Sequence, residues 1–192
     1  MADMIHYSNP QSRGMRTQVL LDYYNLPHRT EVIDFASGQT RSEEYLKIHP
    51  YGRVPALQDG DQTLIESGAI TLYLADKYAD KFGTPAVGTP ERARMYEWMF
   101  FLQATLEPVA TEFFTSDDKA KPIAKLKELL LAMESRYKGK YILGDKVTFL
   151  DVVLACELWW CKLINLYPEG LVLYDRHLAE LGPQLSKNFA PA

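Results

Sequence analysis

Short apolar and polar runs over roughly the first 80 residues predict strands and helices in alternation. Residues 4–8 and 30–35 have the alternation and the β-forming side chains of strands, and residues 15–23 place their apolar side chains on one helical face. An Asp-Gly pair at 59–60 lies between two further apolar runs, which is a strong signal for a β-hairpin, and a helical stripe follows over 70–78. This order predicts a small mixed sheet covered by helices.

A stretch rich in proline and glycine follows, and the pattern beyond it is helical throughout. Helical periodicity covers residues 91–114, where Pro108 is expected to kink the helix, and then residues 122–137. We therefore predict three parts of the chain: a first domain at 1–81, a linker at 82–90 and a second domain at 91–192.

One helix of the second domain is predicted with both of its ends. Residues 148–151 form a capping box, Thr-x-x-Asp, and Val147 and Val152 lie where a hydrophobic staple would. The helix that follows, to about Leu163, is apolar almost all round. Such a helix is typical of the centre of a helical domain.

Composition and charge exclude several classes of protein. The chain has 192 residues, 47% of them hydrophobic, and a net charge of −4, so it is neither a disordered chain nor a basic nucleic-acid-binding protein. Cys156 and Cys161 match no zinc-ligand spacing, so no metal site is expected, and a reduced, cytoplasmic setting is the default. Residues 1–4 resemble no signal peptide, and the most apolar segment, residues 147–161, is too short to cross a membrane.

Polar side chains crowd the loop between the first strand and the first helix. They are Tyr7, Ser8, Asn9, Gln11, Ser12 and Arg13. The N-terminus of a helix presents unpaired N–H groups and the positive end of a dipole, so an anion or a thiolate would be favoured there. On composition alone, an ordinary polar loop with a capping residue is the commoner interpretation.

Two further motifs admit both a structural and a ligand-binding interpretation. Pro55 begins a strand and can follow a cis bond that exposes the backbone of Val54 to a ligand, although an edge-strand proline is commoner. Ser67 is typical of a helix N-cap, but with the amides after it Ser67 could instead hold a carboxylate, while Glu66 takes an ammonium. Glu66 and Ser67 together would match the head group of a free amino acid.

Three motifs in order give the chain a family resemblance. They are Arg53 to Leu74, with its Val-Pro, Asp-Gly and Glu-Ser pairs, then Trp98 to Pro108, and Leu143 to Asp151. The motifs resemble those of the cytosolic glutathione transferases, particularly the bacterial ones, over nearly the whole chain. The resemblance implies an α/β N-terminal domain of thioredoxin-like fold and an all-α C-terminal domain. It also implies a homodimer that binds glutathione and activates its thiol for attack on a small hydrophobic electrophile.

The resemblance also implies which residues bind glutathione. Val54, before a cis Pro55, would pair its backbone with the cysteinyl unit, and Glu66 and Ser67 would hold the γ-glutamyl head. Further positions match at the two ends of the ligand: Arg53 and Gln39 near the glycyl carboxylate, and Gln103 where some relatives place an acid that reaches the γ-glutamyl amine across the dimer. Glutamine cannot supply that charge.

The residue that activates the thiol has two candidates. Serine-type relatives have a serine four residues before an arginine, which Ser12 and Arg16 match. Tyrosine-type relatives have a strand-end tyrosine six residues before an arginine, which Tyr7 and Arg13 match equally well. Ser12 is favoured over Tyr7 because the remaining motifs look bacterial and serine-like.

A catalytic cysteine is absent from this loop. Cysteine-type relatives have a Cys-Pro pair where this chain has Asn9-Pro10, which disfavours disulfide exchange through an enzyme thiol. Asn9 and Ser8 remain possible contributors to thiol activation.

The second substrate is expected between the two halves of the chain, beside the start of the first long helix of the helical domain. Tyr96, Met99 and Phe100 could line an apolar pocket, although plain helix packing accounts for most aromatic side chains on helices. The tail at residues 185–192 is short, so no long lid over this pocket is expected. A non-catalytic binding or protein-interaction module on the same fold is the alternative function.

Overall fold

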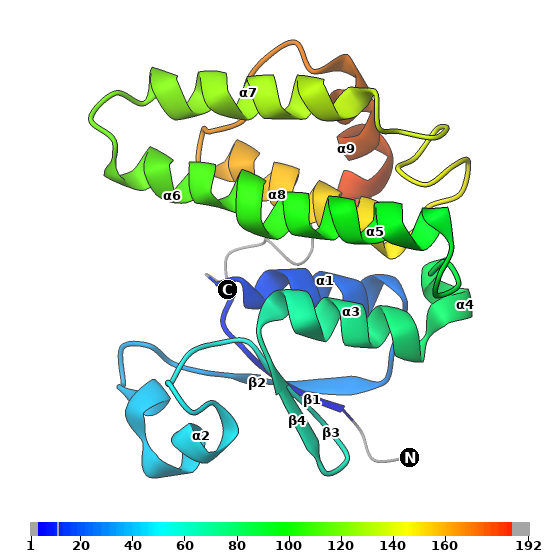
Figure 1. The fold of residues 1–192 in the computed structure, drawn as a ribbon. Coiled ribbons are helices and arrows are strands. Elements are labelled where there is room, and N and C mark those ends of the chain that lie inside the picture. Colours follow the sequence, from blue (N-terminus) through cyan, green and yellow to red (C-terminus); the bar gives the residue numbers. More distant parts are fainter. Residues whose placement is uncertain (1–3, 11, 186–192) are drawn as a thin grey trace. The chain divides into compact units, whose positions relative to one another are not determined.

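The computed structural model describes residues 4–10 and 12–185, which form the elements labelled in Figure 1. They group into two compact units that divide between Tyr78 and Ala79, with Leu185 counted in the first. Each unit is described by itself. The predicted absence of a lid concerns residues 185–192, which beyond Leu185 lie outside the described residues.

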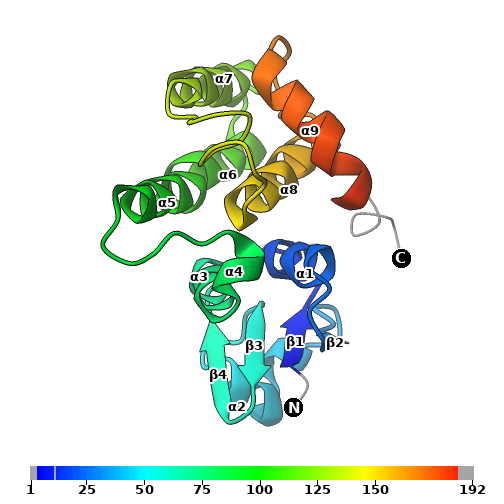
Figure 2. The same cartoon turned by 90° about the vertical axis from the view of Figure 1, so that its right-hand side faces the viewer.

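The first unit is built on a four-stranded mixed sheet with the order β2-β1-β3-β4, which Figure 2 shows from one side. Its strands are β1 (Met4–Ser8), β2 (His28–Val32), β3 (Ala56–Asp59) and β4 (Gln62–Ile65). β1 is parallel to β2 and antiparallel to β3, and β3 and β4 form the predicted hairpin. The strand predicted at 4–8 is confirmed.

The second strand begins and ends earlier than its predicted range, 30–35. The parallel register pairs Met4 with His28 and Ser8 with Val32, so a five-residue β1 limits its neighbour to five residues. Alternation in the sequence shows that a strand exists but carries no information about where its partner ends.

Three helices pack on this sheet. α1 (Gly14–Tyr23) and α3 (Ser67–Lys77) lie together on one face, and α2 (Glu43–Ile48) lies on the other. The core under α1 and α3 includes Leu20 and Leu57, both completely buried. Neither α2 nor the 3₁₀ turn before it was predicted, because a six-residue helix is too short to show a clear apolar period.

The elements of the second unit are all helical within the described residues, and loops join them. Its elements are α4 (Ala79–Phe82), α5 (Pro90–Phe100), the π-helical segment η2 (Phe101–Leu106), α6 (Glu107–Thr115), α7 (Ala120–Glu134), α8 (Phe149–Leu163) and α9 (Val172–Leu185). The disturbance predicted at Pro108 takes the form of a π-helical segment just before it. Proline lacks an N–H and its ring crowds the carbonyl four residues earlier, and a wider turn relieves both problems.

The central helix of this unit, α8, has the predicted bounds and the predicted capping box, and most of its side chains are buried. α9 was not predicted. With the thioredoxin-like sheet of the first unit, these helices confirm the predicted fold class. None of the helices within the described residues is both long and apolar enough to cross a membrane.

Candidate functional site

The loop between β1 and α1 is held by its own hydrogen bonds. The Ser12 hydroxyl donates to the Asn9 carbonyl at 2.6 Å and accepts from the Gly14 N–H at 3.0 Å. Ser12 is half-buried and lies beside the N-terminus of α1, whose N-cap residue Arg13 makes no side-chain capping bond. An anion in this place would compete with the Asn9 carbonyl for the Ser12 proton.

Two other candidates in this loop serve its structure. The Asn9 side-chain amide donates to the Ile33 carbonyl at 2.9 Å, which ties the loop to the end of β2. The Ser8 side chain is buried against the start of α1: a Cβ on Gly14 would lie 2.0 Å from the Ser8 oxygen and 3.1 Å from that of Ser12. Glycine at position 14 therefore lets the helix begin this close to the strand.

Tyr7 points along the sheet toward the start of β1. Its hydroxyl donates to the Gln58 side chain at 3.1 Å, and its ring meets Tyr45 of α2 edge-on at 6.2 Å. Gln58 pairs with Ile5, whereas Tyr7 itself pairs with Ala56, so the bond leads back along β1. The loop that carries Ser12 follows the other end of that strand.

The peptide bond between Val54 and Pro55 is cis, as predicted for a ligand-pairing backbone. Pro55 is buried and Val54 half-buried, and both precede the first ladder residue of β3. The Tyr45 hydroxyl donates to the Arg53 carbonyl at 2.7 Å and anchors the segment from α2. The backbone of Val54 thus lies just outside the β3 ladder.

The start of α3 differs from its prediction. Ser67 is not the N-cap but the first helical residue; the N-cap is Glu66, at φ 71° and ψ 116°, and its side chain makes no capping bond. The buried Ser67 hydroxyl accepts from the Arg16 guanidinium at 3.3 Å, and Arg16 is itself buried. The Glu66 carboxylate accepts from the Tyr51 hydroxyl. Because Glu66 turns the chain with a positive φ and takes the N-cap position, the helix begins at Ser67, one residue earlier than it would with Ser67 as the cap.

This arrangement has the chemistry of a site for a zwitterion. The first turn of α3, with a hydroxyl beside a buried guanidinium, favours an anion. The exposed carboxylate of Glu66 next to it favours a cation. An α-amino-acid head group carries both charges one carbon apart.

The remaining candidates are spread over both units. Gln39 is exposed and its side-chain carbonyl accepts from the Asp34 N–H at 3.0 Å, while the exposed Arg53 guanidinium lies 5.9 Å from the Tyr51 ring. In the helical unit, Gln103 is half-buried in the π-helical segment.

The three residues predicted to line an apolar pocket differ in exposure. Met99 is 2% exposed, as plain helix packing predicts. Tyr96 accepts a hydrogen bond from the Arg92 guanidinium at 2.9 Å, and Phe100 is 64% exposed. Of the three, Phe100 offers the most apolar surface.

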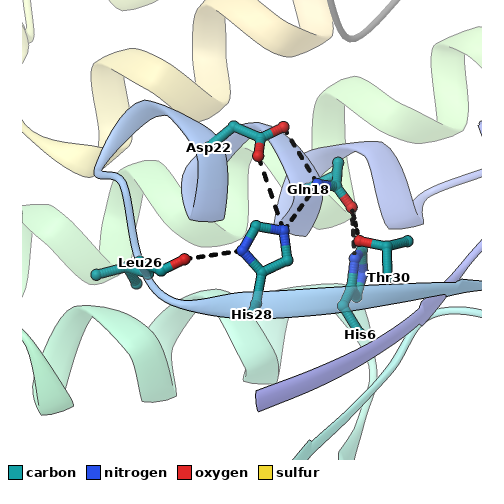
Figure 3. A network of polar contacts seen from close by, with 6 residues as sticks. All are labelled: His6, Gln18, Asp22, Leu26, His28 and Thr30. Atoms are coloured by element: carbon teal, nitrogen blue, oxygen red, sulfur yellow. Dashed lines mark hydrogen bonds and ion pairs between the residues drawn. The ribbon is translucent and has the colours of Figure 1, made fainter. Parts of the chain in front are cut away.

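The sequence did not predict a polar network that joins α1 to the strands β1 and β2 (Figure 3). Gln18 lies at its centre: its side-chain carbonyl meets the His6 Nδ1 at 2.9 Å and the Thr30 hydroxyl at 2.7 Å, and its amide meets the His28 Nε2 at 3.0 Å. Burial lowers the pKa of His6 to about 4, against a smaller opposing contribution from the Gln18 bond. The network joins α1 to both β1 and β2 and so fixes the helix that carries the Ser12 loop.

The links Arg16–Ser67 and Tyr51–Glu66 were also missed, since each joins residues far apart in sequence. In the part of the chain that the structure describes, no group of three or more His, Cys, Asp or Glu side chains could hold a metal ion.

Comparison with known proteins finds a matching family model for each of the two parts of the chain. The family model described as the glutathione S-transferase N-terminal domain matches residues 2–76, and that of the C-terminal domain matches residues 98–170. Glutathione S-transferase PARB from Nicotiana tabacum is 33% identical over 167 residues, which are 79% of this chain and 78% of the relative. Protein URE2 from Candida albicans is 40% identical over 102 residues, which are 50% of this chain and 29% of the length of URE2.

Solved structures show the same fold. A glutathione transferase homolog from Lodderomyces elongisporus, crystallised with two glutathione molecules per subunit, superposes with a TM-score of 0.83 at 23% identity and covers 98% of each chain.

Proposed function

Because the chain belongs to the glutathione S-transferase family of enzymes, we propose that it binds glutathione and activates its thiol as a thiolate for attack on a small apolar electrophile. The observation that carries the proposal is the start of α3, where Glu66 and Ser67 offer a carboxylate and an anion-binding helix end side by side. These groups are complementary to the γ-glutamyl head of glutathione. Glutathione is therefore the co-substrate.

The first unit would bind each part of the tripeptide through different residues. The γ-glutamyl ammonium would bind Glu66, and its carboxylate would bind Ser67 and the first turn of α3. The cysteinyl backbone would pair with Val54 beside the cis Pro55, which lies outside the β3 ladder. Further contacts are proposed for Arg53 and Gln39 at the glycyl carboxylate, for Arg13 in the first loop and for Gln103 at the γ-glutamyl end.

Ser12 is the proposed activator of the thiol. A free thiol has a pKa of about 8.5, and lowering it by ~2 units requires ~2.7 kcal/mol of preferential thiolate stabilisation. A hydrogen bond to a charged group contributes ~1.5–3 kcal/mol, and a helix N-terminus adds ~0.3–1 kcal/mol. Ser12 at the start of α1 offers both, by turning its proton from the Asn9 carbonyl to the sulfur. The thiol proton is released to solvent, and the thiolate then forms the new C–S bond as the leaving group departs with its electron pair.

The rival activators have other partners. The Tyr7 hydroxyl is engaged with Gln58, and the Asn9 amide with Ile33. The Ser12 hydroxyl also has a partner, the Asn9 carbonyl, but Ser12 lies beside the N-terminus of α1, and we therefore propose a serine-type active site. The bacterial affinity within the family stays a prediction.

The larger organisation follows the family. We propose a glutathione-binding domain at 1–81, a linker at 82–90, a helical domain at 91–192, a homodimer and a cytoplasmic setting. The electrophile would meet apolar side chains of the helical domain, with exposed Phe100 and Tyr96 as the first residues to test and buried Met99 behind them.

The thiolate absorbance of bound glutathione, titrated against pH, tests this function. The wild-type protein should lower the thiol pKa by ~2 units, and Ser12→Ala should reverse ~1–2 of them, since one charge-assisted bond is lost. Tyr7→Phe is the matched control and should leave the titration unchanged. A Ser12→Ala titration that overlays the wild-type curve would contradict the assignment of Ser12.

One observation favours a non-catalytic binding module as the second candidate. The Ser12 hydroxyl donates to the Asn9 carbonyl and so has no proton directed at a ligand. A protein that binds glutathione tightly, yet neither lowers its thiol pKa nor turns over halogenated aromatics, isothiocyanates or hydroperoxides, would be such a module.

A further inference from the structure

Tyr51 is joined to the γ-glutamyl site from a different loop. It lies between α2 and β3, and its hydroxyl donates to the carboxylate of Glu66, 15 residues further along the chain. Its ring meets His49 edge-on at 4.6 Å, and the Arg53 guanidinium lies 5.9 Å from the ring centre. A buried histidine and a cation therefore both interact with the ring and restrict its position.

Glu66 needs such a partner. Its backbone has a positive φ, it makes no capping bond with its own helix, and its side chain is exposed. Among the described residues, the Tyr51 hydroxyl is the one hydrogen-bond donor that the Glu66 carboxylate has. Without that bond, the carboxylate would sample several rotamers, and binding would carry the cost of ordering it.

The chemistry of the donor matters as well. A phenol is neutral, so it orients the carboxylate without cancelling its charge, whereas a lysine or arginine in the same place would compete with an incoming ammonium. The bond occupies one carboxylate oxygen and leaves the other for a ligand. The bond also raises the pKa of Tyr51, which keeps the phenol in its donating form.

We propose that Tyr51 is a positioning residue for glutathione, which acts through Glu66 by aiming its carboxylate at the γ-glutamyl ammonium. The inference rests on the proposed function of the Glu66–Ser67 site. It adds a specificity residue from the loop that also carries Arg53, so that one loop serves both ends of the tripeptide.

A double-mutant cycle on glutathione affinity tests the proposal. Tyr51→Phe keeps the ring and removes the bond; it should weaken binding about tenfold and raise KM with kcat unchanged, since a bond to a charged group is lost. Glu66→Gln should weaken binding at least as much, and the double variant should bind no more weakly than Glu66→Gln alone. Tyr73→Phe is the matched control: it removes a tyrosine–carboxylate bond of 2.8 Å to Asp59 in the same unit and should stay within about twofold of wild type.

A glutathione analogue that lacks the γ-glutamyl amino group gives a second readout. Wild type and Tyr51→Phe should bind this analogue equally, because the ammonium that Glu66 recognises is missing. Thermal unfolding of each variant establishes that it is folded. A Tyr51→Phe affinity equal to wild type, or a loss that adds fully to that of Glu66→Gln, would overturn the role of Tyr51 alone. A wild-type protein that binds no glutathione would overturn the proposed function and this inference with it.

Discussion

Two helices of this protein, α3 and α8, begin in opposite ways. At the start of α8 the Asp151 carboxylate is completely buried and accepts from the Thr148 N–H, the Thr148 hydroxyl and the Ile142 N–H, at 2.8, 2.8 and 3.0 Å. At the start of α3 neither Glu66 nor Ser67 caps its own helix: one side chain bonds Tyr51 and the other bonds Arg16.

The difference separates a helix end with a local capping box from one whose side chains bond to other elements. The capping box of α8 satisfies the Thr148 N–H and the Asp151 N–H within one short segment. At the start of α3 the side chains of Glu66 and Ser67 bond to other elements instead of capping the helix. The N–H groups of its first turn therefore need water or a ligand as acceptor.

Breaking the box of α8 should have the largest effect. Asp151→Ala removes the acceptor of three hydrogen bonds in a buried place and should lower the free energy of unfolding by about 3–5 kcal/mol. Urea unfolding measures it. The exposed Asp145, which accepts from the Lys140 N–H at 3.1 Å, is the control, and Asp145→Ala should cost less than about 1 kcal/mol. Equal losses for the two variants would show that the box contributes no more than a surface turn.

Acid should lower the stability of the first unit through His6. Burial holds the pKa of His6 at about 4, below its ordinary 6.5. Between those values the unfolded chain binds a proton that the folded chain does not, so stability falls as the pH falls, by about 3 kcal/mol in all. His6→Asn should flatten this part of the urea midpoint–pH curve.

A control for this titration keeps the imidazole. Thr30→Val removes the hydrogen bond from the Thr30 hydroxyl to Gln18. It should lower the free energy of unfolding by the same amount at every pH and so leave the pH dependence of the urea midpoint unchanged. An unchanged slope in His6→Asn would mean that other groups account for the acid sensitivity.

Local signals explain what the sequence predicted well. The bounds of α8 follow from a capping box and an apolar run that lie within its own residues, 148–163. The hairpin follows from its Asp-Gly pair, and β1 from its own alternation. In each case the residues that decide the structure are neighbours in the chain.

Tertiary contacts explain what the sequence did not predict. Whether Ser67 caps its helix depends on Arg16, 51 residues earlier, and the orientation of Glu66 depends on Tyr51 in another loop. The sequence identified Glu66 and Ser67 as candidates from their residue types and from the resemblance, but no pattern along the chain could show that their side chains bond to Tyr51 and Arg16.

The smallest predicted change in stability is the sharpest test of the comparison, because stability and binding should move in opposite directions. Glu66→Gly removes a side chain from a backbone at φ 71°, a conformation that costs a non-glycine residue ~1–3 kcal/mol. Part of that gain is offset by the greater entropy of glycine in the unfolded chain, so stability should rise by about 1 kcal/mol. Glutathione affinity should nevertheless fall tenfold or more, since the carboxylate that binds the ammonium is gone.

Asn25→Gly, at φ 48° after α1, is the control. Because asparagine tolerates this region, the substitution should change stability by less than ~0.5 kcal/mol, and it should leave glutathione binding unchanged. If Glu66→Gly lowered stability and affinity together, Glu66 would be part of the structural start of α3, and the contrast with α8 would fail.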